Sequence, residues 1–332
     1  MTLSEQYRAL KEQAVIGAVA PRSPIAVRGN DRASYLHGLL TNDIRALTPG
    51  TGCYAAWLTP QGRMLTDLHV FELDDMILLD VPAELASATL QRLDRSLFSE
   101  DVQLSDLSQS LIPVWIHGPG AAAVVRQVLT AAPTVGSWAD YQNGTIEWGG
   151  SPVVLARVNQ LGIPGFCMYV QSAHEVNMRR ELEAAGASHA DPEALEAARV
   201  EAGYPLFGVD MTEDTIPLEA GIEDRAISFT KGCYVGQEVI IRVVHRAHGR
   251  VARKLVALRV DGGVPSRGAK ILSGERDIGW VTSAASSPRL GAIALGYVHR
   301  DFVSPGTHVE IELPPGRIAA VVSERPISPG AR

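Results

Sequence analysis

Residues 231–238 read Lys231-Gly232-Cys233-Tyr234-Val235-Gly236-Gln237-Glu238, which places one thiol between two glycines and surrounds it with polar groups. Lys231 can favour a thiolate by its charge, and the glycines allow backbone geometries that a Cβ would block. Gln237 and Glu238 add an amide and a carboxylate nearby. The alternative is a structural cysteine buried in a tight turn. The glycine spacing and the polar flanks favour a reactive site with Cys233 as its working thiol.

The same eight residues resemble the signature of the YgfZ-type folate-binding proteins. These proteins are relatives of the glycine cleavage T-protein, an aminomethyltransferase, and they support iron-sulfur cluster assembly or repair. The resemblance covers most of the chain, and the eight-residue motif is specific to that branch of the superfamily. It implies an α+β fold of the T-protein kind, in which two ferredoxin-like α+β lobes are followed by a C-terminal β-barrel around a central opening.

Length and composition allow several domains and a large core. The chain has 332 residues, of which 46% are hydrophobic and 20% charged, enough for two or three domains. Its first 20 residues mix charges with apolar positions, so we expect neither a signal peptide nor a membrane span, and a cytoplasmic location. Cys53, Cys167 and Cys233 are widely separated, which argues against a disulfide framework and against a permanently held iron-sulfur cluster.

The charge distribution argues against nucleic acid as a partner, since the net charge is −7 at pH 7. One local run differs, because residues 239–260 contain no acidic residue. The basic residues of this run are Arg242, Arg246, Arg250, Arg253, Lys254 and Arg259. The run is either a solvated charged face or an anion-binding patch. Because it follows the cysteine motif directly, the second interpretation points to an anionic ligand near Cys233.

Periodicity and turn signals predict two successive α+β units. The first has strands at 25–28, 54–58, 64–73, 76–81 and 102–107 and helices at 31–40, capped by Asn30, and 82–98. This order approximates βαββαβ with one extra strand. The second has strands at 112–116, 153–158 and 166–170 and helices at 121–129 and 174–185. Two such halves packed together create a crevice, which is a preferred kind of ligand site.

The last third of the chain has a purely β pattern, which predicts a small barrel. Its strands are expected at 255–260, 269–273, 278–284, 292–299, 308–313 and 318–323. The stretch 204–230 is too long for a simple linker and is expected to be a folded, site-forming loop. We therefore divide the chain into a first lobe at 1–108, a second lobe with the motif loop at 109–250, and a barrel at 251–326.

Four further strings resemble family sequences beside the folate. Residues 199–205 and 217–221 look like the strings that precede the ligand-contacting segment of T-protein relatives, which implies that the Glu201 carboxylate accepts two hydrogen bonds from a pterin edge and that Tyr204 stacks on the ring. A surface glutamate and a core tyrosine are the alternatives. Residues 40–43 resemble the string that ends the first helix and faces the crevice, although turn residues are an ordinary explanation there.

Residues 62–68 resemble the T-protein stretch that carries two adjacent acids beside the folate. Here Thr66 replaces the first acid and leaves Asp67 alone. An acid near the folate nitrogens would help to move a proton during aminomethyl transfer, so this replacement argues against that chemistry without excluding folate binding. The expected cofactor contacts are Asn42, Asp67, Arg199, Glu201, Tyr204, Tyr234 and Arg242, and the expected catalytic group is Cys233 with Lys231, Gln237 and Glu238.

His245 and His248 form an HxxH pair, but no third ligand is in register, so we expect no metal site.

Three hypotheses of function remain. The first is a tetrahydrofolate-binding accessory factor that helps to build or protect iron-sulfur enzymes, in which Cys233 ligates iron or sulfur, forms a mixed disulfide or acts as a nucleophile. The second is a folate-dependent aminomethyl- or methyltransferase. The third is a thiol-bearing interaction protein with a relict pocket. The expected partners are folate and iron-sulfur enzymes or assembly proteins, and the expected state is a monomer.

Overall fold

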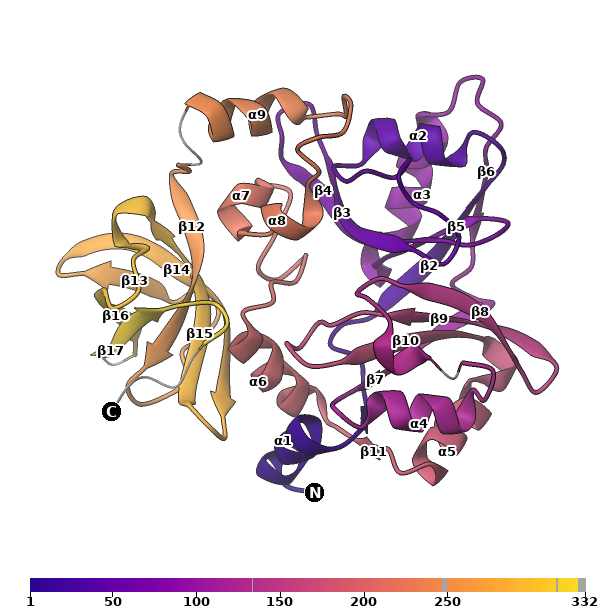
Figure 1. Cartoon of the computed structure of the whole chain (residues 1–332). Coiled ribbons are helices and arrows are strands. Elements are labelled where there is room, and N and C mark those ends of the chain that lie inside the picture. Colours follow the sequence, from indigo (N-terminus) through magenta and orange to yellow (C-terminus); the bar gives the residue numbers. More distant parts are fainter. Residues whose placement is uncertain (133, 247–249, 315, 328–332) are drawn as a thin grey trace.

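Three parts make up the fold, in agreement with the expected two α+β lobes and C-terminal barrel. The computed structural model describes residues 1–132, 134–246, 250–314 and 316–327. The two lobes lie on one side of the molecule and the barrel on the other (Figure 1). Between them lie the helices α7 (Pro217–Ala220), α8 (Glu223–Ala226) and α9 (Gln237–Arg246). None of the helices in those ranges is long and apolar enough to cross a membrane.

The first lobe is a five-stranded antiparallel sheet with the order β3-β4-β5-β2-β6. Without the edge strand β3, this is the strand order of a ferredoxin-like unit, so the extra strand of the sequence prediction is confirmed. Helices α2 and α3 pack their apolar side chains on one face, where Leu36 and Leu93 join the core. The elements are β2 (Arg22–Arg28), α2 (Arg32–Leu39), β3 (Gly52–Leu58), β4 (Met64–Glu72), β5 (Ile77–Pro82), α3 (Ala86–Arg95) and β6 (Gln103–Asp106).

Two helix starts in this lobe differ from the prediction. Asp31, and not Asn30, is the N-cap residue of α2. The Asn30 amide instead donates to Asp101 Oδ2 at 2.8 Å. Pro82 is the last residue of β5, and a 3₁₀ turn at Ala83–Leu85 precedes α3, so the expected helix begins later than the proline suggests. A proline also fits the end of a strand because its missing N–H is not needed there.

The second lobe repeats the arrangement with the order β11-β1-β7-β10-β9-β8. Periodicity did not predict β8, a hairpin partner of β9, or the two-residue strands β1 and β11. The elements are β7 (Leu111–His117), α4 (Ala121–Val128), β8 (Asn143–Trp148), β9 (Ser151–Arg157), β10 (Gly165–Gln171), α5 (Glu175–Ala184) and β11 (Ser188–His189).

The N-terminal segment belongs to the second sheet, which corrects the expected first lobe at 1–108. Strand β1 (Val15–Ile16) lies between β7 and β11, with Val15 opposite both His117 and Ser188. Helix α1 (Leu3–Glu12) packs on α6 (Pro192–Ala202), where Leu10 and Leu195 share one apolar cluster. The first lobe therefore begins only with β2.

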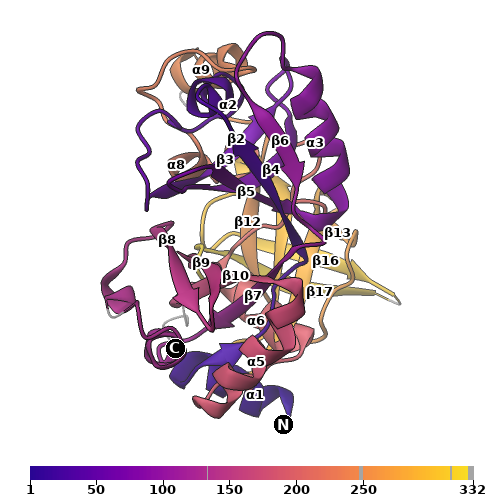
Figure 2. The same cartoon turned by 90° about the vertical axis from the view of Figure 1, so that its right-hand side faces the viewer.

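The inner faces of the two sheets meet in a mixed core. Phe71 and Leu78 of the first lobe pack with Trp115, Val154 and Tyr169 of the second. Figure 2, seen from the side, shows the first lobe stacked above the second. The two repeats therefore form one continuous body.

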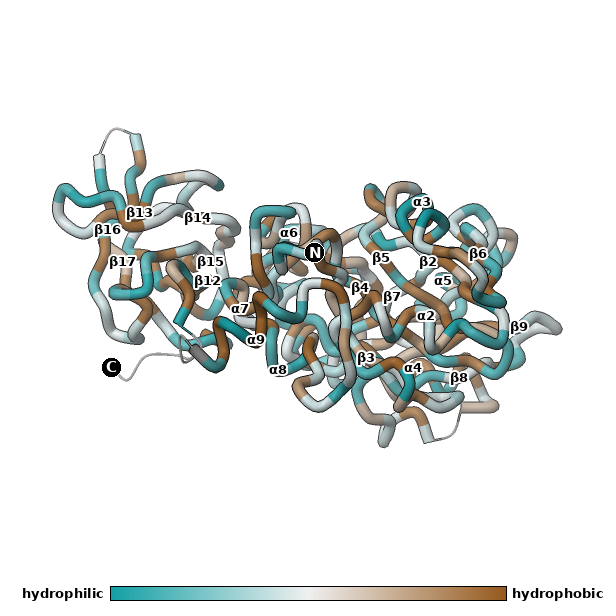
Figure 3. The backbone as a smooth tube through the Cα atoms, turned by 90° about the horizontal axis from the view of Figure 1, so that it is seen from above, coloured by the Kyte–Doolittle hydropathy of each residue, from teal (hydrophilic) through white to brown (hydrophobic). Residues whose placement is uncertain are grey.

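The stretch 204–230 is folded, as expected, and joins the first lobe to the rest of the chain. Its helices α7 (Pro217–Ala220) and α8 (Glu223–Ala226) share an apolar cluster with Tyr54 of β3 and with Tyr234, which precedes α9 (Gln237–Arg246). From above, these helices lie between the barrel and the lobes (Figure 3).

All six strands expected after residue 254 are present, and they close into a barrel with the order β12-β15-β14-β13-β16-β17. Leu258, Val281 and Ile311 are fully buried in its core. The strands are β12 (Arg253–Val260), β13 (Lys270–Ser273), β14 (Arg276–Ser287), β15 (Gly291–His299), β16 (His308–Leu313) and β17 (Gly316–Ser323).

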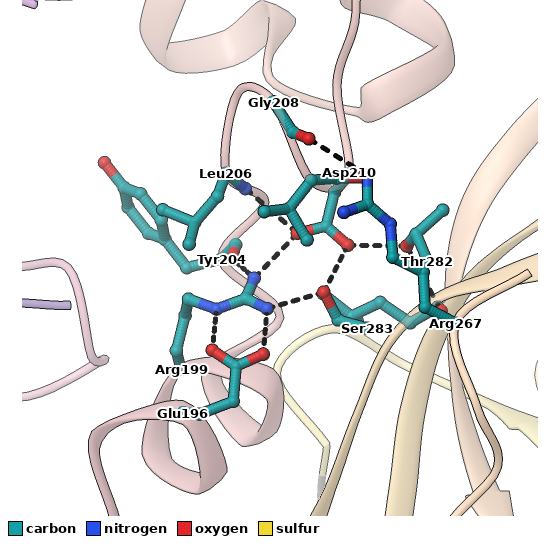
Figure 4. A network of polar contacts seen from close by, with 11 residues as sticks. Glu196, Arg199, Tyr204, Leu206, Gly208, Asp210, Arg267, Thr282 and Ser283 are labelled. Carbon is teal, nitrogen blue, oxygen red and sulfur yellow. Dashed lines mark hydrogen bonds and ion pairs between the residues drawn. The ribbon is translucent and has the colours of Figure 1, made fainter. Parts of the chain in front are cut away.

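A buried ion network ties α6 to the following loop and to the barrel (Figure 4). Arg199 is fully buried, and its guanidinium donates to Asp210 Oδ2 at 2.8 Å and to Ser283 Oγ at 2.6 Å. The Glu196 carboxylate accepts hydrogen bonds from Nε and Nη2 of the same guanidinium. The second oxygen of Asp210 accepts from Thr282 and Ser283 of β14. Because each charge has a partner, the network fixes the angle between the lobes and the barrel without leaving a buried ion unpaired.

We expect Asp210→Asn to lower the free energy of unfolding by about 3 kcal/mol, because the substitution removes one charge of a buried pair and keeps the shape. Urea unfolding followed by circular dichroism measures the change. Glu310→Gln is the control, since Glu310 pairs with Arg317 on the surface of the barrel, and its midpoint should stay close to that of wild type. Equal midpoints for Asp210→Asn and wild type would contradict the role assigned to the network.

Candidate functional site

Lys231 anchors the motif loop to the C-terminal end of α2. Its Nζ donates to the backbone oxygens of His37 and Leu40 at 2.6 Å and of Asn42 at 2.8 Å. These carbonyls need partners because a helix leaves its last C=O groups unsatisfied. Burial lowers the pKa of Lys231 to about 8, which still leaves the ammonium form dominant at pH 7. The charge that was expected to favour the thiolate therefore binds the helix end.

Cys233 is exposed, and all three cysteines of the chain are free. Within the described residues its sulfur makes no hydrogen bond to Lys231. Of the two flanking glycines, Gly236 is required by the backbone: its φ is +84°, and a Cβ would lie 2.5 Å from the Thr59 oxygen. Gln237 and Glu238 form the first turn of α9, where Glu238 is exposed.

The other two thiols lie in strands, where their environment suppresses ionisation. Burial raises the pKa of Cys53 to about 12. Burial also raises the pKa of Cys167, which is fully enclosed in β10, well above its usual value. A thiolate at neutral pH is therefore disfavoured at both positions.

A second cluster centres on Arg225 of α8. The guanidinium carbon lies 3.9 Å from the ring centre of Tyr204 and 4.6 Å from that of Tyr54. No carboxylate pairs with Arg225 in the ranges that the structure describes. The buried hydroxyl of Tyr204 also has no partner there. A largely enclosed guanidinium between two aromatic faces, with free N–H groups, is suited to a planar or anionic ligand.

Asp67 connects this cluster to a chain of buried charges. The Tyr54 hydroxyl donates to Asp67 Oδ2 at 2.8 Å, and Arg22 Nη1 lies 3.4 Å from Asp67 Oδ1. Arg22 Nε donates to Asp80 Oδ2 at 2.6 Å, and His69 Nδ1 lies 2.8 Å from the same oxygen. Residues 67 and 69 share one face of β4 because side chains alternate along a strand.

Tyr141 completes the cluster from the second lobe. Its ring centre is 5.9 Å from that of His69. Among the described residues it is the non-glycine residue with a positive φ, at 63°. Backbone strain of this kind costs of order 1–3 kcal/mol and is held by the surrounding structure. Here the Tyr141 N–H donates to the Arg157 oxygen at 2.7 Å, which fixes the turn.

The structure brings Asp67 and Tyr204 into this cluster but gives Glu201 other partners. The Glu201 carboxylate is 2% exposed and accepts from Tyr7 of α1 and from Arg289 of the β14–β15 hairpin. Its contacts share no residue with those of Asp67. The expected bidentate grip on a pterin would therefore require Glu201 to leave its present partners.

Two other expected cofactor contacts have structural partners. The Asn42 amide donates to the backbone oxygens of Tyr54 at 2.8 Å and Arg225 at 3.1 Å, so it supports the cluster from outside. Arg199 belongs to the network with Asp210. Tyr234 is buried in the apolar cluster around α9, and burial raises its pKa to about 12.

In the described part of the chain, the basic residues of the run lie in different surroundings. Arg242 is exposed on α9, whereas Arg253 pairs with Glu219 at 3.2 Å and Lys254 with Glu223 at 3.7 Å. The side chain of Arg246 and all of His248, half of the HxxH pair, lie outside the described residues. A pocket of about 580 Å³ is lined by Arg250, Val251, Lys254, Arg300, Asp301 and Val303.

Sequence reasoning missed Arg22, Tyr54, His69, Tyr141 and Arg225. The one available signal was the period-two spacing of Asp67 and His69, which places both side chains on one face of a strand. Arg225 stands in an irregular segment, and nothing local distinguishes it from a surface arginine.

Comparisons with known proteins agree with the three-part fold. The profile of the GCVT N-terminal domain matches residues 2–231, and that of the glycine cleavage T-protein C-terminal barrel domain matches residues 253–328. A crystal structure of glycine cleavage system aminomethyltransferase T from Bartonella henselae superposes with a TM-score of 0.88 at 24% identity, over 98% of this chain and 89% of that one. The expected T-protein fold is confirmed.

Two similar sequences carry the same name. An aminomethyltransferase of Geobacillus sp. (strain WCH70) is 27% identical over 332 residues, which cover 98% of this chain and 90% of that protein. An aminomethyltransferase of Streptomyces coelicolor is 29% identical over 311 residues, which cover 91% of this chain and 83% of that protein.

We expect iodoacetamide at pH 8 to modify Cys233 alone in the native protein, because it is exposed while the pKa values of Cys53 and Cys167 are raised by burial. Peptide mass spectrometry counts the modified sites, and the same reaction in urea, which should label all three thiols, is the control. Native labelling of Cys53 or Cys167 as fast as Cys233 would contradict this expectation.

Proposed function

The chain belongs to the glycine cleavage T-protein family, and from this membership we propose that it binds tetrahydrofolate at the Arg225 cluster and transfers a one-carbon group to or from it. Proteins of this family use tetrahydrofolate. The similar sequences are named aminomethyltransferases, which supports the transferase hypothesis before the accessory-factor hypothesis.

The buried carboxylate of Asp67 beside the tyrosine-flanked Arg225 is the observation that carries the proposal. A pterin is a flat, polar heterocycle, and aromatic faces such as those of Tyr54 and Tyr204 suit its rings. The free N–H groups of Arg225 suit a ligand carbonyl or carboxylate, because a guanidinium presents its donors as a fork. Asp67 accepts hydrogen bonds at both oxygens already, which holds it in place to meet a ligand nitrogen.

Thr66 does not take over the role of the acid that stands at this position in the similar T-protein stretch. Its side chain is 1% exposed, and its hydroxyl donates to the Asp67 backbone oxygen at 3.0 Å. In this proposal Asp67 is the remaining acid at positions 66 and 67, and it faces the ligand. Glu201 has a supporting role, in which it holds α1 and the β14–β15 hairpin to the end of α6.

Support of iron-sulfur enzymes, with Cys233 as the working thiol, is the second candidate function. The exposure of Cys233 favours it, because Cys167 is fully buried and Cys53 is partly buried. The Lys231 anchor also holds the loop in one place, beside the C-terminal end of α2 and near the Arg225 cluster that Asn42 supports. Both candidate functions include folate binding, and only the second depends on the Cys233 thiol.

We expect Arg225→Met to weaken tetrahydrofolate binding at least tenfold, since it removes the free charged donors and keeps an apolar chain between the two rings; tenfold is about 1.4 kcal/mol. Isothermal titration calorimetry measures the affinity. Arg126→Gln, an exposed arginine on α4, is the matched control and should bind as wild type does. If Arg225→Met binds as tightly as Arg126→Gln, the ligand does not occupy this cluster.

We expect Cys233→Ser to melt close to wild type, to retain folate binding, and to lose the ability to restore iron-sulfur enzyme activity in cells that lack the protein, because a serine hydroxyl is a poor nucleophile and a poor soft-metal ligand. Cys167→Ser is the matched control: it should lower the melting temperature, because it buries a hydroxyl, while its folded fraction still complements. Full complementation by Cys233→Ser would remove the second candidate function and leave the first intact.

A further inference from the structure

His69 is a fully enclosed imidazole with one nitrogen engaged and one free. The residue is 1% exposed, and Nδ1 lies 2.8 Å from Asp80 Oδ2. Its Nε2 is buried and has no hydrogen-bond partner in the part of the chain that the structure describes. Buried polar atoms of folded proteins nearly always have a partner, so a free Nε2 calls for a ligand or a water.

The surroundings determine which nitrogen carries the proton. Asp80 is fully buried, and its Oδ2 accepts from Arg22 Nε at 2.6 Å, so it is placed to accept the Nδ1–H of a neutral imidazole as well. Burial lowers the pKa of His69, and the charge of Arg22 acts in the same direction. At neutral pH, Nε2 therefore presents a lone pair.

The charged groups that face His69 are Arg22 of β2, Asp67 of β4 and Asp80 of β5. The other neighbours are aromatic: ring centres lie 5.8 Å away for Tyr54, 5.9 Å for Tyr141 and 6.3 Å for Trp115. Tyr54 also lies against Arg225, so His69 directly adjoins the proposed folate site. Each oxygen of Asp67 already has one donor, and the acceptors of these groups without a partner among the described residues are His69 Nε2 and Asp80 Oδ1. Of these two, a neutral imidazole nitrogen is the stronger base.

We propose that His69, held by Asp80, is the proton acceptor of the Arg225 cluster and does the work of the acid that Thr66 replaces. This inference rests on the proposed one-carbon transfer. The acceptor substrate is then an amine with an N–H group, which receives the carbon. The donor substrate carries that carbon on a basic leaving group.

The step balances as follows. The amine nitrogen of the folate attacks the carbon, so an N–C bond forms while the bond from that carbon to the leaving group breaks and its electron pair departs with the leaving group. The N–H bond of the amine breaks, its electron pair stays on nitrogen, and the proton moves to His69 Nε2. Asp80 stabilises the resulting imidazolium. The imidazolium then gives its proton to the leaving group, so His69 returns to its neutral form.

His69→Asn tests the role, because the asparagine amide can still donate to Asp80 but cannot accept a proton. Transfer from a small aminomethyl donor to tetrahydrofolate should slow by about 10²–10⁴-fold at neutral pH, the range for loss of a general base. The wild-type rate should fall on the acid side, below the ordinary His pKa of about 6.5, as Nε2 becomes protonated. The variant should lose this limb and keep its tetrahydrofolate affinity, measured by calorimetry.

His117→Asn is the matched control, since His117 is also fully buried with free ring nitrogens but stacks on Trp115 in the second lobe. It should retain the acid limb and the rate of its folded fraction. If wild type turns over while His69→Asn keeps both the rate and the limb, the proposal is overturned and the folate function stands. If wild type neither binds tetrahydrofolate nor turns over, both fall together.

A measurement on the wild-type protein covers the case in which His69→Asn does not fold. Imidazole ¹⁵N spectra should show an unprotonated Nε2 for His69 at pH 7, with a resonance that shifts when tetrahydrofolate is added. A protonated Nε2, or a resonance that does not shift at saturating tetrahydrofolate, would overturn the proposal.

Discussion

The buried guanidinium of Arg199 is the constraint on which the geometry of this molecule depends. Enclosing one positive charge is costly unless carboxylates compensate it, and Asp210 and Glu196 do so. Asp210 stands in the loop after α6, and its second oxygen is held by β14 of the barrel. These contacts therefore fix the path of the loop that follows α6. Since Arg199 also donates to the Tyr204 backbone oxygen at 2.6 Å, this path places the tyrosine ring over Arg225.

The two lobes share a topology but differ in the chemistry of their inner faces. The first lobe contributes Arg22, Asp67, His69 and Asp80 from adjacent strands, and they partner one another. The second contributes His117 and Tyr169, whose side-chain polar atoms have no partners among the described residues. A repeated fold can thus supply one polar wall and one mostly apolar wall, and the proposed ligand site lies at the polar one.

Sequence alone predicts those features that local patterns record. All six barrel strands and most lobe strands were predicted because apolar residues alternate along them, and the motif around Cys233 is contiguous. The strands β1 and β11 have two residues each, too few to show a period. The Arg225 cluster joins side chains from positions 54 to 225, and Glu201 meets Tyr7 across 194 positions. Such contacts have no local signal, so the prediction that Glu201 contacts a pterin rests on its motif position alone.

The insertion of β1 between β7 and β11 has a consequence for how the chain folds during synthesis. Residues 22–106 form a contiguous sheet that can assemble as soon as it is made, whereas the second sheet needs residues 15 and 188 side by side. The segment around residue 15 is synthesised before the first lobe but pairs only after residue 188 is made, so it must stay unpaired on that side while the whole first lobe folds. Because closure of so long a loop is slow, the assembly of this sheet is expected to limit the folding rate. Deletion of β1 would remove an interior strand of the second sheet. A cut between the two lobes in the sequence would likewise separate β1 from the sheet to which it belongs.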